Sequence, residues 1–366
     1  LGRAAGFQVG ALQIRTGESA DAGAPAEDFS VVRVNRDVLR RSRVGVIATR
    51  RSSGQEGFRP SYAYGADASF NFTTEFSATA YFAKTDTPGV PDDDTSYRGR
   101  VEWSADTGGF QAEHLYVGDG FEPAVGFKRR SAFRQSSVEG RFSPRPARLP
   151  GIRKLYYEAG LDRLENTAGV LESRQAQGTF RIEFDNTDQL TVEVTNEFEN
   201  LDEPFEVATG VEVPEGDYRF TRGRVSYQLS PSRRLSGFLS VTRGSFYSGT
   251  ITEASWRGRV EFSSRLYAEP TVSFNHVSTR FGAGNANLFG SRLTFTLSPR
   301  MFVGALVQYQ SRSQSVSTNA RFRWEYAPGS ELFIVYSDGR STFESGFPPR
   351  LESRSMVVKV TRLFRW

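Results

Sequence analysis

The chain has 366 residues, no cysteine and two histidines, so disulfides, thiol nucleophiles and Cys- or His-rich metal sites are excluded. Its 46 Lys and Arg against 42 Asp and Glu leave a net charge of +4, which is not the strongly basic balance of a nucleic-acid-binding protein. Charges recur too often for a helical membrane span, which needs about 20 mostly apolar residues. A membrane-crossing β-strand needs only about 9–11 residues, so that class stays open.

The chain begins with Leu1-Gly2-Arg3, which resembles the end of a strand, and it has neither an initiator Met nor a signal peptide. We therefore expect residues 1–366 to be one β-barrel domain, the C-terminal part of a longer precursor.

Apolar and polar residues alternate with a period of two, which predicts β-strands because successive strand side chains point to opposite faces. At 252–262, for example, Trp256 and Val260 alternate with Arg257 and Arg259. No comparable stretch keeps a helical period. Alternation and turn residues together predict about 20 strands. Their spans are 3–15, 28–35, 43–51, 58–72, 75–86, 96–106, 109–118, 134–143, 152–163, 171–185, 189–198, 216–229, 234–244, 251–263, 266–280, 286–298, 301–311, 317–327, 331–338 and 353–366.

The connections alternate between short turns and long polar loops, which is typical of outer-membrane barrels. The sequence thus predicts an all-β, transmembrane, antiparallel up-and-down β-barrel with both termini in the periplasm. The turn at 144–151 is long for the short-turn end. The long loops, expected outside the cell, are 16–27, 87–95, 119–133, 199–215 and 339–352.

A soluble sandwich or propeller can alternate in the same way. Its strands average about 5–6 residues, however, whereas many of those predicted here have 11–15. A charged face on many strands and aromatic residues near strand ends also favour the membrane barrel. The aromatic residues expected to face lipid are Tyr62, Phe72, Trp103, Phe184, Trp256, Trp324 and Tyr326.

The charged face is expected to line the lumen, where two roles are open. The charges can form a ladder of cross-strand pairs in a solvated wall, or a ring that selects solutes by field and size. The ladder is the favoured main role. The residues are Arg98, Arg100, Glu102, Arg181, Glu183, Arg257, Arg259, Glu261, Arg321, Arg323 and Glu325.

The C-terminal segment 356–366 has apolar residues at alternate positions and ends in an aromatic residue. It resembles the last strand of bacterial outer-membrane proteins, which the barrel-assembly machinery recognises. The resemblance implies that Val360, Phe364 and Trp366 form the assembly signal. Trp in place of the usual Phe, and Arg362 beside it, depart from the family pattern.

The N-terminal segments 6–16, 29–39 and 42–49 resemble an uncharacterised bacterial barrel domain that follows a family 9 carbohydrate-binding-like module. The specific similarity covers roughly the first 50 residues. The segments that carry it are GFQVGALQIRT, FSVVRVNRDVL and SRVGVIAT. It implies that such a module and further strands lie upstream, and it implies no activity.

Three smaller features have ordinary interpretations that we prefer. Asp92-Asp93-Asp94 offers carboxylates for Ca²⁺ but without a calcium-loop spacing, so a solvated loop is expected. Lys128-Arg129-Arg130 can meet lipopolysaccharide phosphate, and a solvated charge run is the simpler interpretation. His114 and His276 have no G-x-S-x-G elbow or other catalytic motif near them, so both are expected to be structural.

The sequence therefore predicts a channel or transporter-like pore in the outer membrane of a Gram-negative-type bacterium. The rival is a non-conducting anchor that displays an upstream carbohydrate-binding-like module or docks a surface assembly; a barrel hydrolase has little support. We expect no enzymatic activity, cofactor, metal or nucleic acid. The expected partners are outer-membrane lipid, lipopolysaccharide, the assembly machinery, and an upstream module or partner protein that plugs the lumen.

Overall fold

The computed structural model describes residues 2–4, 6–19, 23–55, 57–90, 93–208, 210–343 and 349–364. Throughout these ranges the secondary structure is β-strand and turn, without a helix. Within the same ranges, no helix is long and apolar enough to cross a membrane. Twenty-two strands belong to one hydrogen-bonded sheet, and two more form a separate hairpin.

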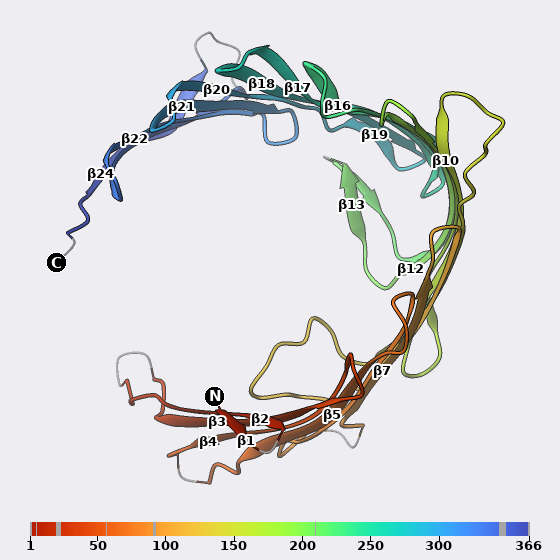
Figure 1. The fold of residues 1–366 in the computed structure, drawn as a ribbon, viewed down its shortest axis with the longest axis vertical. Coiled ribbons are helices and arrows are strands. Elements are labelled where there is room, and N and C mark those ends of the chain that lie inside the picture. Colours follow the sequence, from red (N-terminus) through yellow and green to blue (C-terminus); the bar gives the residue numbers. More distant parts are fainter. Residues whose placement is uncertain are drawn as a thin grey trace. The chain divides into compact units, whose positions relative to one another are not determined.

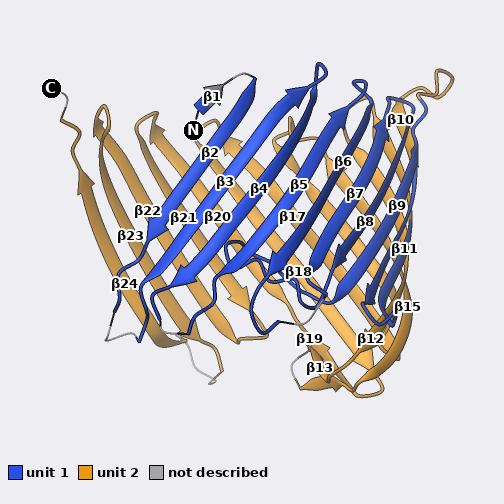
Figure 2. Ribbon diagram, turned by 90° about the horizontal axis from the view of Figure 1, so that it is seen from below, with its two compact units in different colours: residues 1–144, 157–177 blue, residues 145–156, 178–366 orange. Residues whose placement is uncertain are grey.

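The chain divides into two compact units (Figure 2). Unit 1 comprises Leu1–Pro144 and Tyr157–Gln177, and unit 2 comprises Arg145–Tyr156 and Gly178–Trp366. Each unit is described by itself below.

Unit 1 is an antiparallel meander in which each strand pairs with the next (Figure 1). The second half of β10 (Ile152–Asn166) pairs with β9, and the first part of β11 (Leu171–Phe184) also belongs to this unit. The other strands are β1 (Gly2–Ala4), β2 (Phe7–Arg15), β3 (Glu27–Val38), β4 (Ser42–Ser53), β5 (Ser61–Asn71), β6 (Phe76–Asp86), β7 (Thr95–Ser104), β8 (Gly108–Val117) and β9 (Phe133–Phe142).

Unit 2 continues the same pattern of antiparallel neighbours. Strand β18 pairs with β19 near one end and with β20 along the rest of its length. The strands are β12 (Gln189–Leu201), β15 (Gly216–Leu229), β16 (Leu235–Phe246), β17 (Gly249–Ser263), β18 (Leu266–Thr279), β19 (Gly282–Asn285), β20 (Leu288–Ser298), β21 (Met301–Gln310), β22 (Ser315–Ala327), β23 (Ser330–Ser341) and β24 (Arg350–Thr361). The separate hairpin consists of β13 (Phe205–Ala208) and β14 (Val211–Val213).

Hydroxyl side chains close several of the short turns. Thr73 Oγ1 accepts hydrogen bonds from the backbone N–H groups of Glu75 and Phe76, at 3.1 and 2.9 Å. Ser263 Oγ does the same for Arg265 and Leu266. A hydroxyl two or three residues before an N–H group mimics a backbone turn, so it directs the chain straight back into the next strand.

The prediction of an all-β chain of antiparallel hairpins is confirmed, and each of the 20 predicted strands is present. The predicted strand 3–15 is divided at Gly6, which has a φ of 80° and lies in the turn directly before β2. The short strands β13, β14 and β19 were not predicted, and the last strand ends at Thr361 rather than at 366. Closure of the sheet into a barrel stays a prediction.

Burial in both units is the reverse of that in a soluble protein. Many large hydrophobic side chains are exposed along the strands, among them Trp103, Val138, Val241 and Phe274, and only a few are buried. The side chains that are buried below a tenth of their surface include many Ser and Thr, together with Asp188 and Asp338. A soluble domain buries its apolar face, whereas the described residues supply no protein layer that covers the apolar face of this sheet.

Candidate functional site

The strand register separates each unit into two faces. In unit 1, Tyr97, Val101 and Trp103 of β7 lie opposite Tyr116, Ala112 and Phe110 of β8. The intervening residues of β7 face Leu115, Glu113 and Gln111 instead. Cross-strand partners share a face, so the alternation carries from strand to strand. We call the two sides the apolar face and the charged face.

The charged face of unit 1 carries paired ions. Arg98 donates two hydrogen bonds to Glu113, at 2.8 and 2.7 Å. Arg100 binds Glu102 at 2.7 Å and lies 3.8 Å from Glu113. Because the arginines lie on β7 and Glu113 on β8, the two contacts to Glu113 join neighbouring strands, as a ladder does, whereas the Arg100–Glu102 pair lies within β7.

A glycine lets one ion pair of unit 1 reach across a whole strand. Arg33 on β3 binds Asp67 on β5 through its guanidinium group, and β4 lies between them. Gly45 of β4 is the residue crossed. A Cβ atom there would lie 2.3 Å from Asn35 Oδ1 and 2.7 Å from Arg33 Nη2. The missing side chain therefore makes room for the link.

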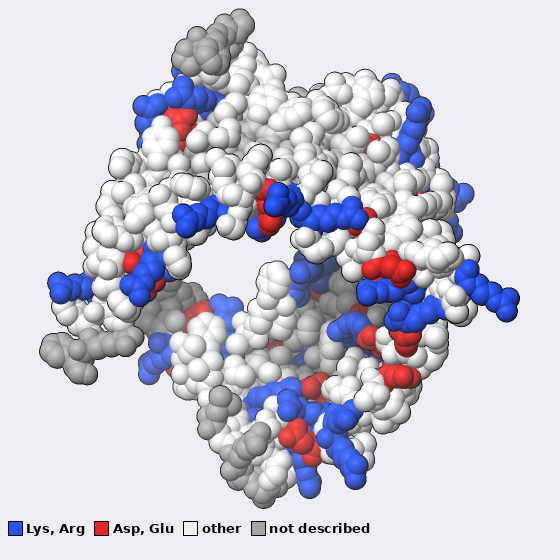
Figure 3. All heavy atoms as spheres, turned by 45° about the horizontal axis from the view of Figure 1, so that its top comes forward, with Lys and Arg blue, Asp and Glu red and all other residues white. Residues whose placement is uncertain are grey.

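The charged face of unit 2 mixes ion pairs with cation–π contacts. Glu183 accepts hydrogen bonds from Arg153 at 3.0 Å and from the Tyr156 hydroxyl at 2.9 Å. Arg259 binds Glu261 at 2.9 Å and stacks 3.9 Å from the centre of the Tyr267 ring. The space-filling view in Figure 3 shows small clusters in which Lys or Arg side chains lie beside Asp or Glu side chains.

The remaining predicted lumen residues of unit 2 vary in their contacts. Arg323 binds Glu331, and Arg181 stacks 4.0 Å from the Tyr156 ring. Glu325 accepts the backbone N–H of Gly329 in a turn. For Arg257 and Arg321 the described residues supply no ion pair. Within each unit the predicted lumen residues thus lie on the charged face, most of them in separate ion pairs or cation–π stacks on different strands.

The hairpin β13–β14 lies against the charged face of unit 2. Val213 is fully buried and packs with Tyr218, Phe220 and Tyr247. Tyr218 and Phe220 have the same parity on β15 as Arg222 and Arg224, which places them on the charged face. Figure 1 shows β13 set off to the inner side of the curved row of unit 2 strands. The predicted external loop 199–215 therefore folds back over the sheet.

One polar contact holds the hairpin itself, and a second holds Tyr247, against which the hairpin packs. Glu206 lies 3.7 Å from Arg312, in the turn between β21 and β22. At the β16–β17 turn, Tyr247 donates a hydrogen bond to Glu199. Burial raises the pKa of Tyr247, and the hydrogen bond to the Glu199 carboxylate raises it further, so the hydroxyl remains a donor.

The apolar face of unit 1 has two aromatic rows. At the short-turn end, Phe72 stacks on Phe76, with ring centres 5.4 Å apart, and Trp103 and Phe110 continue the row across β7 and β8. At the long-loop end, Tyr97 stacks on Tyr116 at 5.1 Å. Tyr97 and Trp103 are six residues apart, which is about 20 Å along a strand.

The other predicted aromatic residues occupy comparable positions, with one exception. Tyr62 lies at the long-loop end of β5, and Trp324 and Tyr326 lie near the short-turn end of β22. Phe184 ends β11 and contacts the Tyr227 ring. Trp256 instead lies in the middle of β17, opposite Leu239 and Val272, because alternation predicts a face but not a height along the strand.

The last strand presents Val360 on the apolar face opposite Leu332. Phe364 follows the end of the strand and is exposed, and the Arg362 guanidinium group lies 5.0 Å from its ring centre. Trp366, the third residue of the predicted assembly signal, lies outside the described residues.

The smaller candidates have ordinary partners. Asp93 accepts a hydrogen bond from Tyr116 at 2.5 Å, and Asp94 lies 3.5 Å from Lys84, whereas Asp92 lies outside the described residues. Lys128 pairs with Glu122, and Arg130 pairs with Glu172. Within the described ranges, no group of three or more His, Asp or Glu side chains could hold a metal ion.

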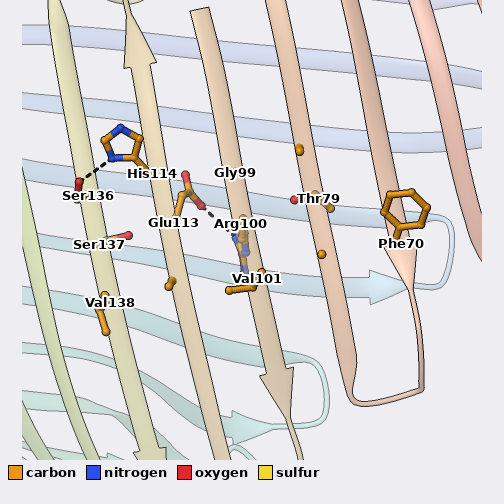
Figure 4. A pocket seen from close by; sticks show the side chains of 13 residues that line it. Phe70, Thr79, Gly99, Arg100, Val101, Glu113, His114, Ser136, Ser137 and Val138 are labelled. Carbon is orange, nitrogen blue, oxygen red and sulfur yellow. Dashed lines mark hydrogen bonds and ion pairs between the residues drawn. The ribbon is translucent and has the colours of Figure 1, made fainter.

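Both histidines lie on the apolar face and each contacts a polar neighbour. His114 Nδ1 is 2.8 Å from Ser136 Oγ, and His276 Nδ1 is 2.7 Å from Asn285 Oδ1. His114 also borders a hollow of about 410 Å³ in unit 1, where Figure 4 shows its ring directed toward Ser136 on the next strand. The alternation of the sequence is enough to assign both histidines to this face, but it could not have predicted the hollow beside His114.

Comparison with known proteins adds little. No protein-family model matches the sequence, and no curated protein matches it significantly. Among solved structures, a variant of the ferric enterobactin receptor of Pseudomonas aeruginosa is 10% identical over 96% of this chain and 71% of its own, with a TM-score of 0.48. A second variant, in complex with enterobactin, is 11% identical over 96% and 72%, with the same TM-score. Similarity at this level transfers no ligand or activity.

Proposed function

We propose that this chain is a β-barrel of the bacterial outer membrane and forms a channel or transporter-like pore. The observation that carries the proposal is the reversed burial. An apolar face bounded by aromatic rows suits the hydrocarbon core and its two interfaces, where such girdles lie in membrane barrels. The paired arginines and glutamates of the opposite face suit a hydrated lumen wall. No enzymatic role is part of the proposal.

Size supports a lumen. Barrels with 16–18 strands leave an aqueous channel, and those with 22 usually hold a plug. Of the 22 strands described in this sheet, 20 have nine residues or more and are long enough to cross a membrane, whereas β1 and β19 have three and four residues. The hairpin β13–β14 on the charged face of unit 2 would occupy part of that lumen. It is the one observation that favours the second candidate, a non-conducting anchor for an upstream carbohydrate-binding-like module, because an occupied lumen conducts poorly.

Two measurements test the proposal. The purified chain is folded into phosphatidylcholine vesicles and run on a gel with and without heating. We expect a mobility shift on heating, as a folded membrane barrel gives. Protein that stays outside the vesicles would contradict the membrane location. In a planar bilayer a pore gives steps of conductance, whereas a folded but silent protein would support the anchor.

A further inference from the structure

We propose that the hollow beside His114 binds an acyl chain of lipopolysaccharide, with the lipid phosphate held by Arg134 and Arg163. This inference rests on the proposed membrane location and adds a defined lipid site to it. Every residue involved belongs to unit 1.

The hollow is apolar because small residues meet there. Ala80 and Gly99 lie in one cross-strand row with His114 and Ser136, and Ala78 and Ala112 lie in the next row toward the short turns. Larger rings lie beyond both rows, with Phe82 and Tyr97 on the long-loop side. The small side chains leave a hollow of about 410 Å³, which the ring of Phe70 also lines (Figure 4). A hydrocarbon chain is the ligand that such a depression in a lipid-facing surface fits.

His114 and Ser136 form a polar rim at the hollow, and a lipid with hydrogen-bonding groups could bind there. His114 Nδ1 contacts Ser136, and the described residues offer no partner to His114 Nε2. An unsatisfied ring nitrogen in hydrocarbon is costly. An ester or amide carbonyl at the head of an acyl chain would satisfy it at this depth, one row below Tyr116.

Cations next to Ser136 provide the charge complement. Arg163 is the cross-strand partner of Ser136, and Arg134 is the partner of Tyr116. Both bind Glu165, so the trio has a net charge of 2 − 1 = +1. Their side chains are 41% and 53% exposed. Each guanidinium has five N–H donors, so donors remain for a phosphate after Glu165 is bound.

The position of the hollow along β8 favours a lipid of the outer leaflet over one of the inner leaflet. The rim lies at the end of β8 that leads into the long loop 118–132, which the predicted topology puts outside the cell. The outer leaflet there consists of lipopolysaccharide, whose lipid A portion combines several acyl chains with phosphates. A phospholipid of the inner leaflet would present its head group at the opposite end of these strands.

The test counts lipid A retained by the full chain. The protein is folded into phosphatidylcholine vesicles that contain lipid A and is then transferred to detergent, and bound lipid A is measured by mass spectrometry. We expect retention to fall about tenfold in Gly99→Leu, which fills the hollow, and in the double variant Arg134→Gln/Arg163→Gln, which removes the phosphate ligands. A Cβ at Gly99 meets no atom within 4 Å, so the first variant should fold.

Matched controls separate the site from general lipid contact. Gly140→Leu places the same side chain on the apolar face outside the hollow, again with no atom within 4 Å. Arg243→Gln removes an apolar-face arginine of unit 2. A further variant, His114→Leu, removes the ring nitrogens from the rim and should also lower retention, and His276→Leu on the apolar face of unit 2 is its control. All three controls should retain lipid A as the unmodified chain does.

Three results would overturn the inference: unchanged retention in Gly99→Leu or in the double arginine variant, equal loss in the controls, or full displacement of lipid A by phosphatidylethanolamine. The heat-induced gel shift is recorded for every variant. If the chain folds in vesicles but never retains lipid A, only the lipid site is contradicted. If the chain does not enter vesicles, the proposed membrane location is contradicted.

Discussion

The charged faces of the two units both carry cross-strand ion pairs, but they differ in what covers them. In unit 1, ions bridge strands directly, as Arg98 does to Glu113 and Arg33 does to Asp67 across Gly45. In unit 2, an aromatic cluster around Phe220 supports a hairpin that folds back from a long loop. The strands of both units alternate alike. A common strand pattern thus permits an open polar wall in one unit and a covered one in the other, and the loop makes the difference.

The largest effect should follow from removing the support of the hairpin. Phe220 is 4% exposed and its ring lies 5.2 Å from that of Tyr247. Phe220→Ala leaves a cavity under β13–β14 and should cost about 3–5 kcal/mol of the free energy of unfolding. Urea titration in vesicles measures it, and the 202–215 segment should become sensitive to protease. Phe262→Ala, at a 61% exposed position, is the control. Equal losses in both would mean that the cluster does not hold the hairpin.

The next effect tests what the units share, the apolar face. Val241, in the middle of β16, is 54% exposed. An arginine near the bilayer midplane costs about 2–4 kcal/mol. Val241→Arg should therefore reduce folding into vesicles, as read by the gel shift on heating. Asn319→Arg, on the charged face, should fold normally because it meets water. The reverse order would mean that the faces are assigned the wrong way round.

A smaller effect should follow from closing the gap at Gly45. In Gly45→Ala the added Cβ displaces the Asn35 and Arg33 side chains, so the link to Asp67 is strained or lost. Overpacking of this kind costs about 1–3 kcal/mol. Gly304→Ala, where a Cβ meets no atom within 4 Å, is the control in unit 2. Urea unfolding compares them, and identical stabilities would contradict the role given to Gly45.

The smallest effect concerns the ion pairs themselves. Arg98 and Glu113 are 37% and 22% exposed, so their coupling should be only about 0.2–1 kcal/mol. A double-mutant cycle with Arg98→Gln and Glu113→Gln measures it, and the coupling should decrease in high salt because screening weakens such pairs. A coupling of several kcal/mol would show that the charged face of unit 1 is stabilised as strongly as the covered face of unit 2.

Much of the fold follows from the sequence alone. The period of two determines which residues share a face, because a strand leaves its side chains no other choice. Residues such as Arg100, Arg259 and Val360 could therefore be assigned to a face without any knowledge of their neighbours. The turn residues similarly located the short connections, since a hydroxyl such as that of Thr73 acts within three residues.

Contacts between distant parts of the chain required the tertiary structure. That Arg33 reaches Asp67 depends on which strands are neighbours and on their register, and the hairpin β13–β14 depends on packing against β15 and the β16–β17 turn. The hollow beside His114 likewise needs small residues from β6, β7 and β8 at one height. Alternation assigns a side but carries no information about height or about partners on other strands, which arise only when separate segments pair.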